Sequence, residues 1–264
     1  MDWNVNRLKS QLREFPWFRT ASADEYGPTY DGFALFNYTP WHIAKRDDEL
    51  RYVSSLVLDF KKDERTEPKA VRAAREAIRL IAVEALHDLI WHHKWKGQAL
   101  PRDEKDRWWQ TPDGASDSSG NGWHEGIPPG QGWHDRMLMA VPGHLRGIGK
   151  PATKAFADAI CSMPWYPAVE LGDPPHFAQQ SLQRHTEQER STVQRQSMAQ
   201  HLETMRLIDD PKPDSAHHHD GALKFMLVDD VYTTGATYGA CKHLVRERYP
   251  AADIMGMFVA ITAY

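Results

Sequence analysis

The apolar and polar positions of the first hundred residues predict helices and strands in a mixed order. A helix is expected before Pro16, because the apolar residues there recur at helical spacing and proline ends such an element. Apolar runs with aromatic or β-branched residues predict strands at 33–38 and 55–60. A long helix is expected from Pro68, which suits a first helical turn. The periodic residues are Val5, Leu8, Leu12 and Phe15 in the first helix, and Val71, Ala74, Ile78, Ile81, Ala85 and Leu89 in the second.

From residue 136 onwards, strands and helices are expected to alternate. Short apolar runs predict strands at 137–141, 168–171, 225–228 and 253–262. Apolar residues at helical spacing predict helices at 151–163 and 186–207, and a third that ends at Tyr249. Thr186 and Glu189 fit a capping box at the start of the second of these. Such alternation predicts an α/β fold with a parallel sheet.

Composition divides the chain into three regions. Residues 1–100 form an N-terminal extension of helices and strands, and residues 136–264 form a core. Between them, residues 101–135 are rich in Trp, Gly and Pro and have no period. This insertion is interpreted either as a flap over a pocket or as a variable, flexible surface loop, and the sequence leaves both open.

Charge and cysteine content restrict the class of protein. The 264 residues carry a formal net charge of −4, so direct binding to nucleic acid is not indicated, since that favours a basic surface. The two cysteines, Cys161 and Cys241, have no metal-ligand spacing, and free thiols in a reducing compartment are expected. The N-terminus lacks a signal-peptide pattern, and no apolar run approaches the length of a membrane span. A cytoplasmic location is therefore predicted.

The strongest chemical signal is the segment 225–237. Four apolar residues lead into two carboxylates, Asp229 and Asp230 (the acidic pair), and Thr-Thr-Gly-Ala-Thr follows at 233–237. An apolar run of this kind is typical of a buried parallel strand, whose C-terminal end is where open α/β sheets bind ligands. A glycine-containing turn that leads into a helix presents N–H groups to a phosphate. The segment therefore predicts a site for a phosphorylated sugar.

Segment 225–237 resembles the ribose-phosphate signature of type I phosphoribosyltransferases. The resemblance implies a parallel sheet flanked by helices, with the N-terminal α+β extension as a hood over the site. It also implies that 5-phosphoribosyl-1-pyrophosphate is the ligand, that Mg²⁺ is the cofactor, and that Asp229 and Asp230 are the catalytic and metal-binding residues. Thr233 stands where purine-salvage members often carry an acid, so no group that could protonate a base is visible. The implied phosphoribosyl-binding residues are Val231, Tyr232, Thr233, Thr234, Gly235, Ala236 and Thr237.

A second candidate site follows the strand at 137–141. The turn at 142–150 contains glycines, a histidine and two cations, which suits an anion. In type I phosphoribosyltransferases a loop at the matching position holds pyrophosphate, and Arg195 offers a guanidinium that could grip it bidentately. The predicted pyrophosphate-binding residues are Pro142, Gly143, His144, Arg146, Lys150 and Arg195.

Residues 141–195 also resemble the competence-associated (ComF-type) branch of the family. Val141-Pro142, Arg146-Gly147 and an alanine-rich helix follow the order of that branch. Its mobile arm has counterparts in Gln180, Arg184, Arg190 and Arg195. Two features depart from the branch: there is no cysteine zinc ribbon, and Met198 stands where the arm usually has asparagine.

Two classes of function are compatible with these patterns. The first is transfer of the phosphoribosyl group to a nitrogenous acceptor that the sequence does not identify. The second is a non-catalytic regulator or interaction module that reads phosphoribosyl metabolites, attached to a DNA-handling or defence system. A homodimer, and a protein partner that contacts residues 1–135, are both left open.

Overall fold

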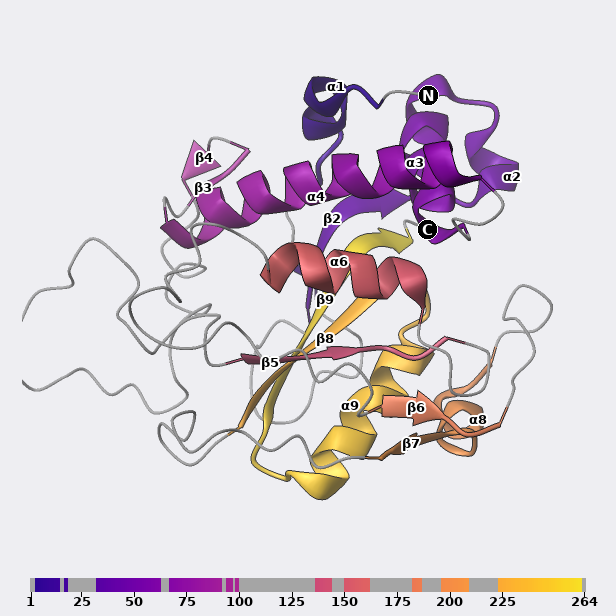
Figure 1. Cartoon of the computed structure of the whole chain (residues 1–264), viewed down its shortest axis with the longest axis vertical. Coiled ribbons are helices and arrows are strands. Elements are labelled where there is room, and N and C mark those ends of the chain that lie inside the picture. Colours follow the sequence, from indigo (N-terminus) through magenta and orange to yellow (C-terminus); the bar gives the residue numbers. More distant parts are fainter. Residues whose placement is uncertain are drawn as a thin grey trace, which may run out of the picture.

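The computed structural model describes eleven stretches of the chain, with a central parallel sheet between two helical layers (Figure 1). Its helices are α1 Val5–Ser10, α2 Trp41–Ala44, α3 Asp48–Lys61, α4 Pro68–Trp91, α6 Pro151–Cys161, α8 Met198–Leu202 and α9 Ala236–Arg248. Its strands are β1 Trp17–Phe18, β2 Gly32–Tyr38, β3 Lys94–Trp95, β4 Gln98–Ala99, β5 Arg136–Ala140, β6 Leu182–Arg184, β7 Met205–Leu207, β8 Lys224–Tyr232 and β9 Asp253–Thr262. The described residues are 3–14, 17–18, 32–62, 67–91, 94–96, 98–99, 136–143, 150–161, 182–186, 196–208 and 223–262.

The main sheet has the strand order β1-β2-β9-β8-β5. Strands β2, β9, β8 and β5 run parallel, and the short β1 pairs antiparallel with β2 at the edge. The expected α/β fold with a parallel sheet is therefore confirmed. Strand β2 pairs with β9 from Gly32 opposite Gly256 to Tyr38 opposite Thr262, so residues of the N-terminal region belong to the same sheet as β8 and β9.

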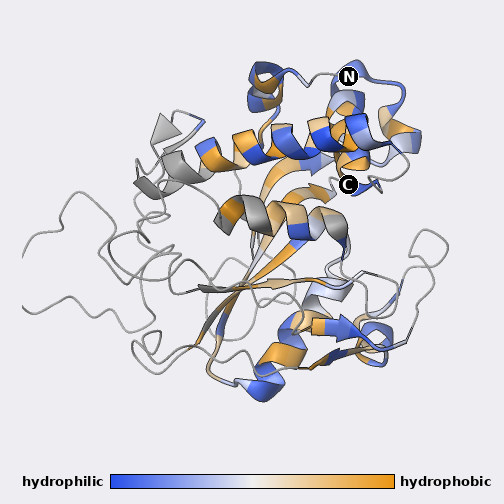
Figure 2. Cartoon of the chain, in the orientation of Figure 1, coloured by the Kyte–Doolittle hydropathy of each residue, from blue (hydrophilic) through white to orange (hydrophobic). Residues whose placement is uncertain are grey.

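Both faces of the sheet are covered, which explains the continuous apolar runs of its strands. Figure 2 shows β8 and β9 as largely hydrophobic, whereas α3 and α4 carry both hydrophobic and hydrophilic bands. Successive side chains of β8 point to opposite faces. Accordingly, Met226 and Val228 belong to one buried cluster, and Phe225 and Leu227 belong to the other.

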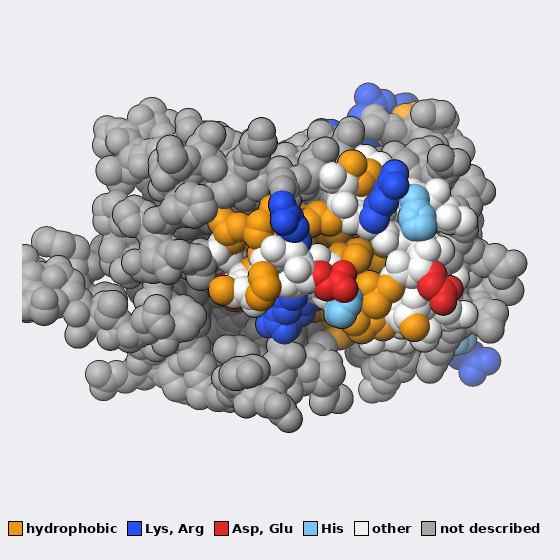
Figure 3. Space-filling view, turned by 90° about the horizontal axis from the view of Figure 1, so that it is seen from below, with side chains coloured by type: hydrophobic (Ala, Val, Ile, Leu, Met, Phe, Trp, Pro, Cys, Tyr) orange, Lys and Arg blue, Asp and Glu red, His pale blue; other side chains and the backbone are white. Residues whose placement is uncertain are grey.

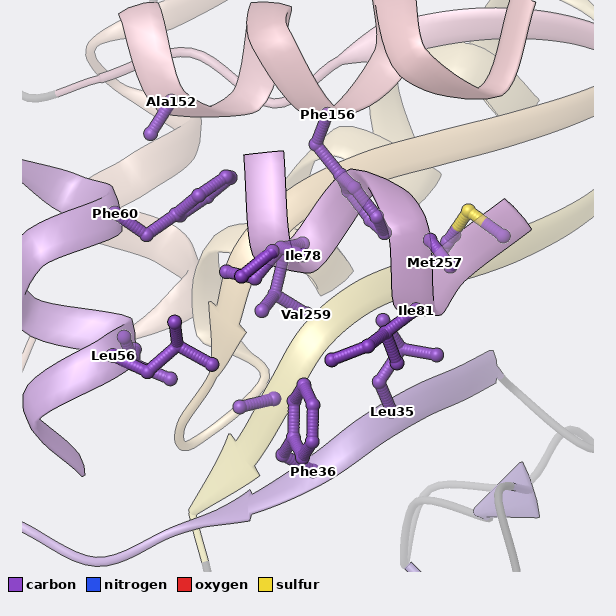
Figure 4. Close-up of a cluster of buried hydrophobic side chains, with 14 of the residues drawn as sticks. Leu35, Phe36, Leu56, Phe60, Ile78, Ile81, Ala152, Phe156, Met257 and Val259 are labelled. Atoms are coloured by element: carbon purple, nitrogen blue, oxygen red, sulfur yellow. The ribbon is translucent and has the colours of Figure 1, made fainter. Parts of the chain in front are cut away.

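The first cluster lies between the sheet and helices α3, α4 and α6 (Figure 4). The rings of Phe60 from α3 and Phe156 from α6 meet edge to face, with centroids 6.4 Å apart. The stripe predicted for α4 is confirmed over its described side chains, which are at most 6% exposed. These buried residues of α4 are Val71, Ala74, Ile78, Ile81 and Ala85.

The second cluster lies on the other face, between the sheet, α9 and the β6–β7 hairpin. Tyr238 of α9 packs edge to face on Phe258 of β9, and Leu182 and Met205 anchor the hairpin in the same cluster. Cys241 of α9 is buried here as a free thiol, as predicted.

Two predicted elements are wrong. Residues 55–60 lie in helix α3 and not in a strand; Asp47 caps this helix by accepting hydrogen bonds from the N–H groups of Glu49 and Leu50. The helix expected at 186–207 is also wrong within the described residues. There, Ser197 and Gln200 form the capping box of the short α8, and β6 and β7 pair antiparallel around it. The strand expected at 168–171 and the insertion at 101–135 lie outside the described residues.

Candidate functional site

The acidic pair lies at the C-terminal end of β8, where the neighbouring strand has already ended. Pairing between β5 and β8 stops at Ala140 opposite Val228, and the N–H of Val141 makes one further bond to the Val228 carbonyl. Asp229 and Asp230 follow directly, each 4% exposed. Each carboxylate accepts the N–H of the next residue, at 2.7 Å for Asp229 Oδ1 and 2.8 Å for Asp230 Oδ1. The pair thus accepts two backbone N–H groups at the point where pairing with β5 ends.

Lys150, the residue before α6, holds both carboxylates. Its Nζ lies 2.5 Å from Asp229 Oδ1 and 3.2 Å from Asp230 Oδ1. Adjacent residues of a strand point to opposite faces, so a single ammonium can bridge them only where the strand is open at its side. The edge left by the end of β5 provides that opening. The sequence assigned Lys150 to pyrophosphate and the pair to ribose and metal; the structure brings these residues into direct contact.

Burial and charge act on the two carboxylates in opposite directions. Burial, reinforced by the neighbouring carboxylate, raises the pKa of Asp229 to about 7 against the attraction of Lys150. Burial also acts to raise the pKa of Asp230, but Lys150, Lys61 and hydrogen bonds to its charged form outweigh it and lower that pKa. For Lys150, burial acts to lower the pKa, and the attraction of both carboxylates exceeds this and raises it. Lys150 therefore favours its charged form, and Asp230 is the member of the pair whose surroundings favour ionisation.

Two residues of the N-terminal region complete this site, and the sequence did not indicate them. Lys61, at the end of α3, places its Nζ 3.4 Å from Asp230 Oδ2 while its side chain remains 43% exposed. Tyr38, at the end of β2, has a pKa raised by burial and by the charge of Asp230. The signal for Lys61 was available: Val53, Leu56 and Phe60 have the spacing of a helix that ends at this lysine.

The 233–237 turn follows β8 and leads into α9. Gly235 precedes the helix with a φ of 77°, a left-handed conformation that favours glycine. A Cβ at this position would lie 2.1 Å from the Tyr232 hydroxyl oxygen, so the ring of Tyr232 also requires glycine here. That ring is fixed edge to face against Phe258, with centroids 5.2 Å apart. The turn therefore places the first N–H groups of a thirteen-residue helix at the C-terminal edge of the sheet.

A buried polar network lies behind the turn. Arg184 of β6 is 3% exposed; its Nε donates to the Gly143 carbonyl at 2.7 Å, and its Nη1 donates to Thr204 Oγ1. Its Nη2 lies 3.3 Å from Nδ1 of His201, and Nε2 of His201 lies 3.1 Å from Thr237 Oγ1. Gly143 and Thr237, which the sequence placed in two separate anion sites, are thus joined through two buried side chains.

The structure describes only part of the predicted pyrophosphate site. Pro142 and Gly143 are buried after β5, and Lys150 contacts the acidic pair. His144, Arg146 and Arg195 lie outside the described residues. Arg184, noted in the sequence only as an arm residue, and His201, which the sequence did not indicate, are the described polar residues that the fold adds beside Thr237.

The acidic pair has the chemistry that a magnesium ion requires. Mg²⁺ is held by one or two carboxylates together with water and substrate phosphate oxygens, and a dedicated cage of protein ligands is not needed. The described residues contain no cluster of three or more His, Cys, Asp or Glu that could form such a cage. Asp229 and Asp230 therefore fit a metal that is shared with a phosphorylated ligand.

Figure 3 shows the face around α9, where basic, acidic and histidine side chains are interspersed with hydrophobic ones. The described part of this face therefore carries no continuous basic strip of the kind that contacts a nucleic-acid backbone. Among the described helices, none combines the length and the apolar composition needed to cross a membrane.

No protein-family model, curated protein or solved structure matches the chain.

Proposed function

We propose that this protein is a magnesium-dependent phosphoribosyltransferase with 5-phosphoribosyl-1-pyrophosphate as donor and a nitrogenous compound as acceptor. One observation carries the proposal: two buried carboxylates at the C-terminal end of β8 are followed at once by the 233–237 turn and the start of α9. Acceptors for sugar hydroxyls and donors for a phosphate thus stand side by side at the ligand-binding edge of a parallel sheet. The resemblance of residues 225–237 to type I phosphoribosyltransferases supplies the identity of the sugar.

Each part of the site has a role in this reaction. Asp229 and Asp230 accept hydrogen bonds from the ribose hydroxyls, and the hydroxyl and N–H groups of the 233–237 turn donate to the 5′-phosphate. The 1-pyrophosphate then lies towards the end of β5, where Gly143 and Lys150 stand. His144, Arg146 and Arg195 are proposed to contribute to that side.

The chemistry depends on positioning and charge stabilisation. The C1–O bond to pyrophosphate breaks with its electron pair leaving on the pyrophosphate, and the ribose gains oxocarbenium character. The acceptor nitrogen then forms the new bond to C1 and gives its proton to the released pyrophosphate or to water. No nucleophilic side chain is required, because the fixed carboxylates and donors hold the reacting atoms in line. A bound magnesium ion supplies neutralisation of the leaving pyrophosphate, and the acidic pair would hold it.

Lys150 has two roles in turn. Its ammonium pairs with two buried carboxylates, which would otherwise be costly to bury. Asp229 and Asp230 would hold a divalent cation through the same oxygens, and Lys150 would then be able to face the pyrophosphate. Lys61, more exposed and held only at 3.4 Å, is the second cation that can turn from Asp230 to the ligand.

Calorimetric titration of 5-phosphoribosyl-1-pyrophosphate with Mg²⁺ tests the proposal. We expect saturable binding by the wild-type protein and none by Asp229→Asn/Asp230→Asn. Glu203→Gln is the control for loss of a carboxylate, since Glu203 is exposed and outside the site. Unaltered binding in the double variant, with its fold checked by circular dichroism, would reject the site.

Release of pyrophosphate separates an enzyme from a sensor. A screen of nitrogenous acceptors should give pyrophosphate release that requires Mg²⁺ and is lost in Asp229→Asn/Asp230→Asn. Binding without release for every acceptor class would contradict the transferase and leave a protein that reads the phosphoribosyl metabolite.

A further inference from the structure

The network of Arg184, His201 and Thr237 determines where the protons lie on His201. A guanidinium has only donors, so Nη2 of Arg184 can pair only with an acceptor on the imidazole. Nδ1 of His201 must therefore carry the lone pair, and the proton of the neutral ring is on Nε2. That N–H points to Thr237 Oγ1 at 3.1 Å, so the threonine oxygen accepts from His201.

This arrangement leaves the hydroxyl proton of Thr237 available for another acceptor. A threonine hydroxyl has one donor, and it is not needed towards a histidine that already donates. Thr237 is only partly buried, in the first turn of α9, whereas His201 and Arg184 are 6% and 3% exposed. The network is thus closed on its inner side and presents a donor on its outer side.

The surroundings keep His201 neutral. Burial lowers its pKa to about 4, with further contributions from the charges of Arg184 and Lys150. An imidazolium would place a second donor against Arg184, which offers no acceptor. The ring is therefore held in one tautomer over the range in which a phosphate monoester is a dianion.

We propose that His201 and Arg184 are positioning residues that fix the Thr237 hydroxyl as a hydrogen-bond donor to the 5′-phosphate of the ligand. The inference rests on the proposed function and extends it to residues outside segment 225–237. Arg184 also holds the Gly143 carbonyl, so the same side chain ties the phosphate end of the site to the turn after β5. The group that the Thr237 hydroxyl would recognise is a phosphate monoester on a sugar, and not pyrophosphate alone.

Two probes distinguish this role from simple support of the fold: ribose 5-phosphate and inorganic pyrophosphate, each titrated with Mg²⁺. We expect His201→Phe to weaken binding of ribose 5-phosphate roughly tenfold or more, as for loss of a hydrogen bond to a charged group, and to leave pyrophosphate binding unchanged. His201→Gln should retain affinity, because its amide offers an acceptor and a donor in place of Nδ1 and Nε2. Thr237→Val should weaken binding of ribose 5-phosphate as much as His201→Phe does, and Thr237→Ser should weaken it little. In the double variant His201→Phe/Thr237→Val the two losses of affinity should not add.

The outcomes separate this inference from the function on which it rests. Equal weakening of both probes in His201→Phe, or no weakening of either, overturns the positioning role and leaves the phosphosugar site standing. Failure of the wild-type protein to bind either probe overturns both proposals. A measurement on the wild-type protein needs neither a ligand nor a folded variant. The ¹⁵N chemical shifts of the His201 ring should show a protonated Nε2 and an unprotonated Nδ1. The opposite tautomer would also overturn the inference.

Discussion

Lys150 and Asp229, 79 positions apart in the sequence, lie with Nζ and Oδ1 at 2.5 Å. The contact joins the N-terminal end of α6 to the C-terminal end of β8 and is only partly accessible to solvent. The same ammonium also lies 3.2 Å from Asp230 Oδ1. The oxygens of the acidic pair that would hold a divalent metal are therefore the ones that contact Lys150.

Lys150→Met is expected to destabilise the protein and to make it depend on magnesium. Removing the ammonium leaves two buried carboxylates without their shared partner, at a cost of about 3 kcal/mol in the free energy of unfolding. Added Mg²⁺ should raise the melting temperature of this variant more than that of the wild-type protein. Lys154→Met, an exposed position one turn along α6, is the control and should respond to Mg²⁺ as the wild type does. A variant as stable as wild type, with the same response to Mg²⁺, would contradict the ion-pair assignment.

Lys61→Met is expected to affect ligand binding more than stability. The lysine is 43% exposed, so its pairing with Asp230 should contribute at most about 1 kcal/mol to the free energy of unfolding. If Lys61 turns to the pyrophosphate as proposed, titration of 5-phosphoribosyl-1-pyrophosphate should show an affinity lowered roughly tenfold, the scale of one charge-assisted hydrogen bond. Lys62→Met serves as the comparison, because Lys62 pairs with Asp59 and Glu67. Equal affinities of the two variants would remove Lys61 from the site.

Gly235→Ala is expected to cost about 1–3 kcal/mol in the free energy of unfolding and to weaken phosphate binding. The substitution forces a left-handed φ of 77° on a residue with a Cβ and drives that atom into Tyr232. Tyr232→Phe removes the hydroxyl that lies 2.1 Å from the added Cβ, so Gly235→Ala/Tyr232→Phe should recover part of the loss.

Gly239→Ala provides the matched control for Gly235→Ala in denaturant unfolding. Gly239 lies inside α9, and an added Cβ there would meet only the flexible side chain of Met198, at 3.3 Å from its sulfur. Alanine favours a helix interior over glycine by up to about 1 kcal/mol, so this variant should be as stable as the wild type or more stable. Equal losses at positions 235 and 239 would contradict the account of the turn.

Lowering the pH should destabilise the wild-type protein relative to His201→Gln. The pKa of His201 falls from 6.5 in the unfolded chain to about 4 in the fold, so between these values only the unfolded chain takes up the proton. The contribution of His201 is therefore complete above pH 6.5 and is lost as the pH falls towards 4. The difference between wild type and variant should change by on the order of 2–3 kcal/mol across this window, measured by urea unfolding at several pH values. A difference that stays constant with pH would mean that His201 is not buried in its neutral form.

The local pattern of the sequence was sufficient for the elements whose apolar residues have a clear helical or strand spacing. The α4 stripe, the buried runs of β8 and β9, and the strand–turn–helix order around Asp229 all followed from spacing and composition, because each is a property of neighbouring residues. The short run at 55–60 was ambiguous between a strand and a buried helix segment. The apolar residues from Val53 to Phe60 have helical spacing, and Asp47 caps the first turn, so this segment is a helix. The β6–β7 hairpin could not be found in this way, since its pairing joins residues 182–184 with 205–207 and overrides local helical preference.

The sequence by itself determined the parallel α/β fold class and the acidic pair with its following turn, because these features depend on residues that are neighbours in the sequence. Only the tertiary structure decided that Lys150 and Lys61 approach Asp229 and Asp230, and that His201 and Arg184 stand behind Thr237. Those contacts link α3, α6, α8 and β6 to β8 and α9 across gaps of 17 to 169 residues. The physical reason is that charge pairing and tautomer choice depend on distances in space, which the packing of both faces of the sheet sets.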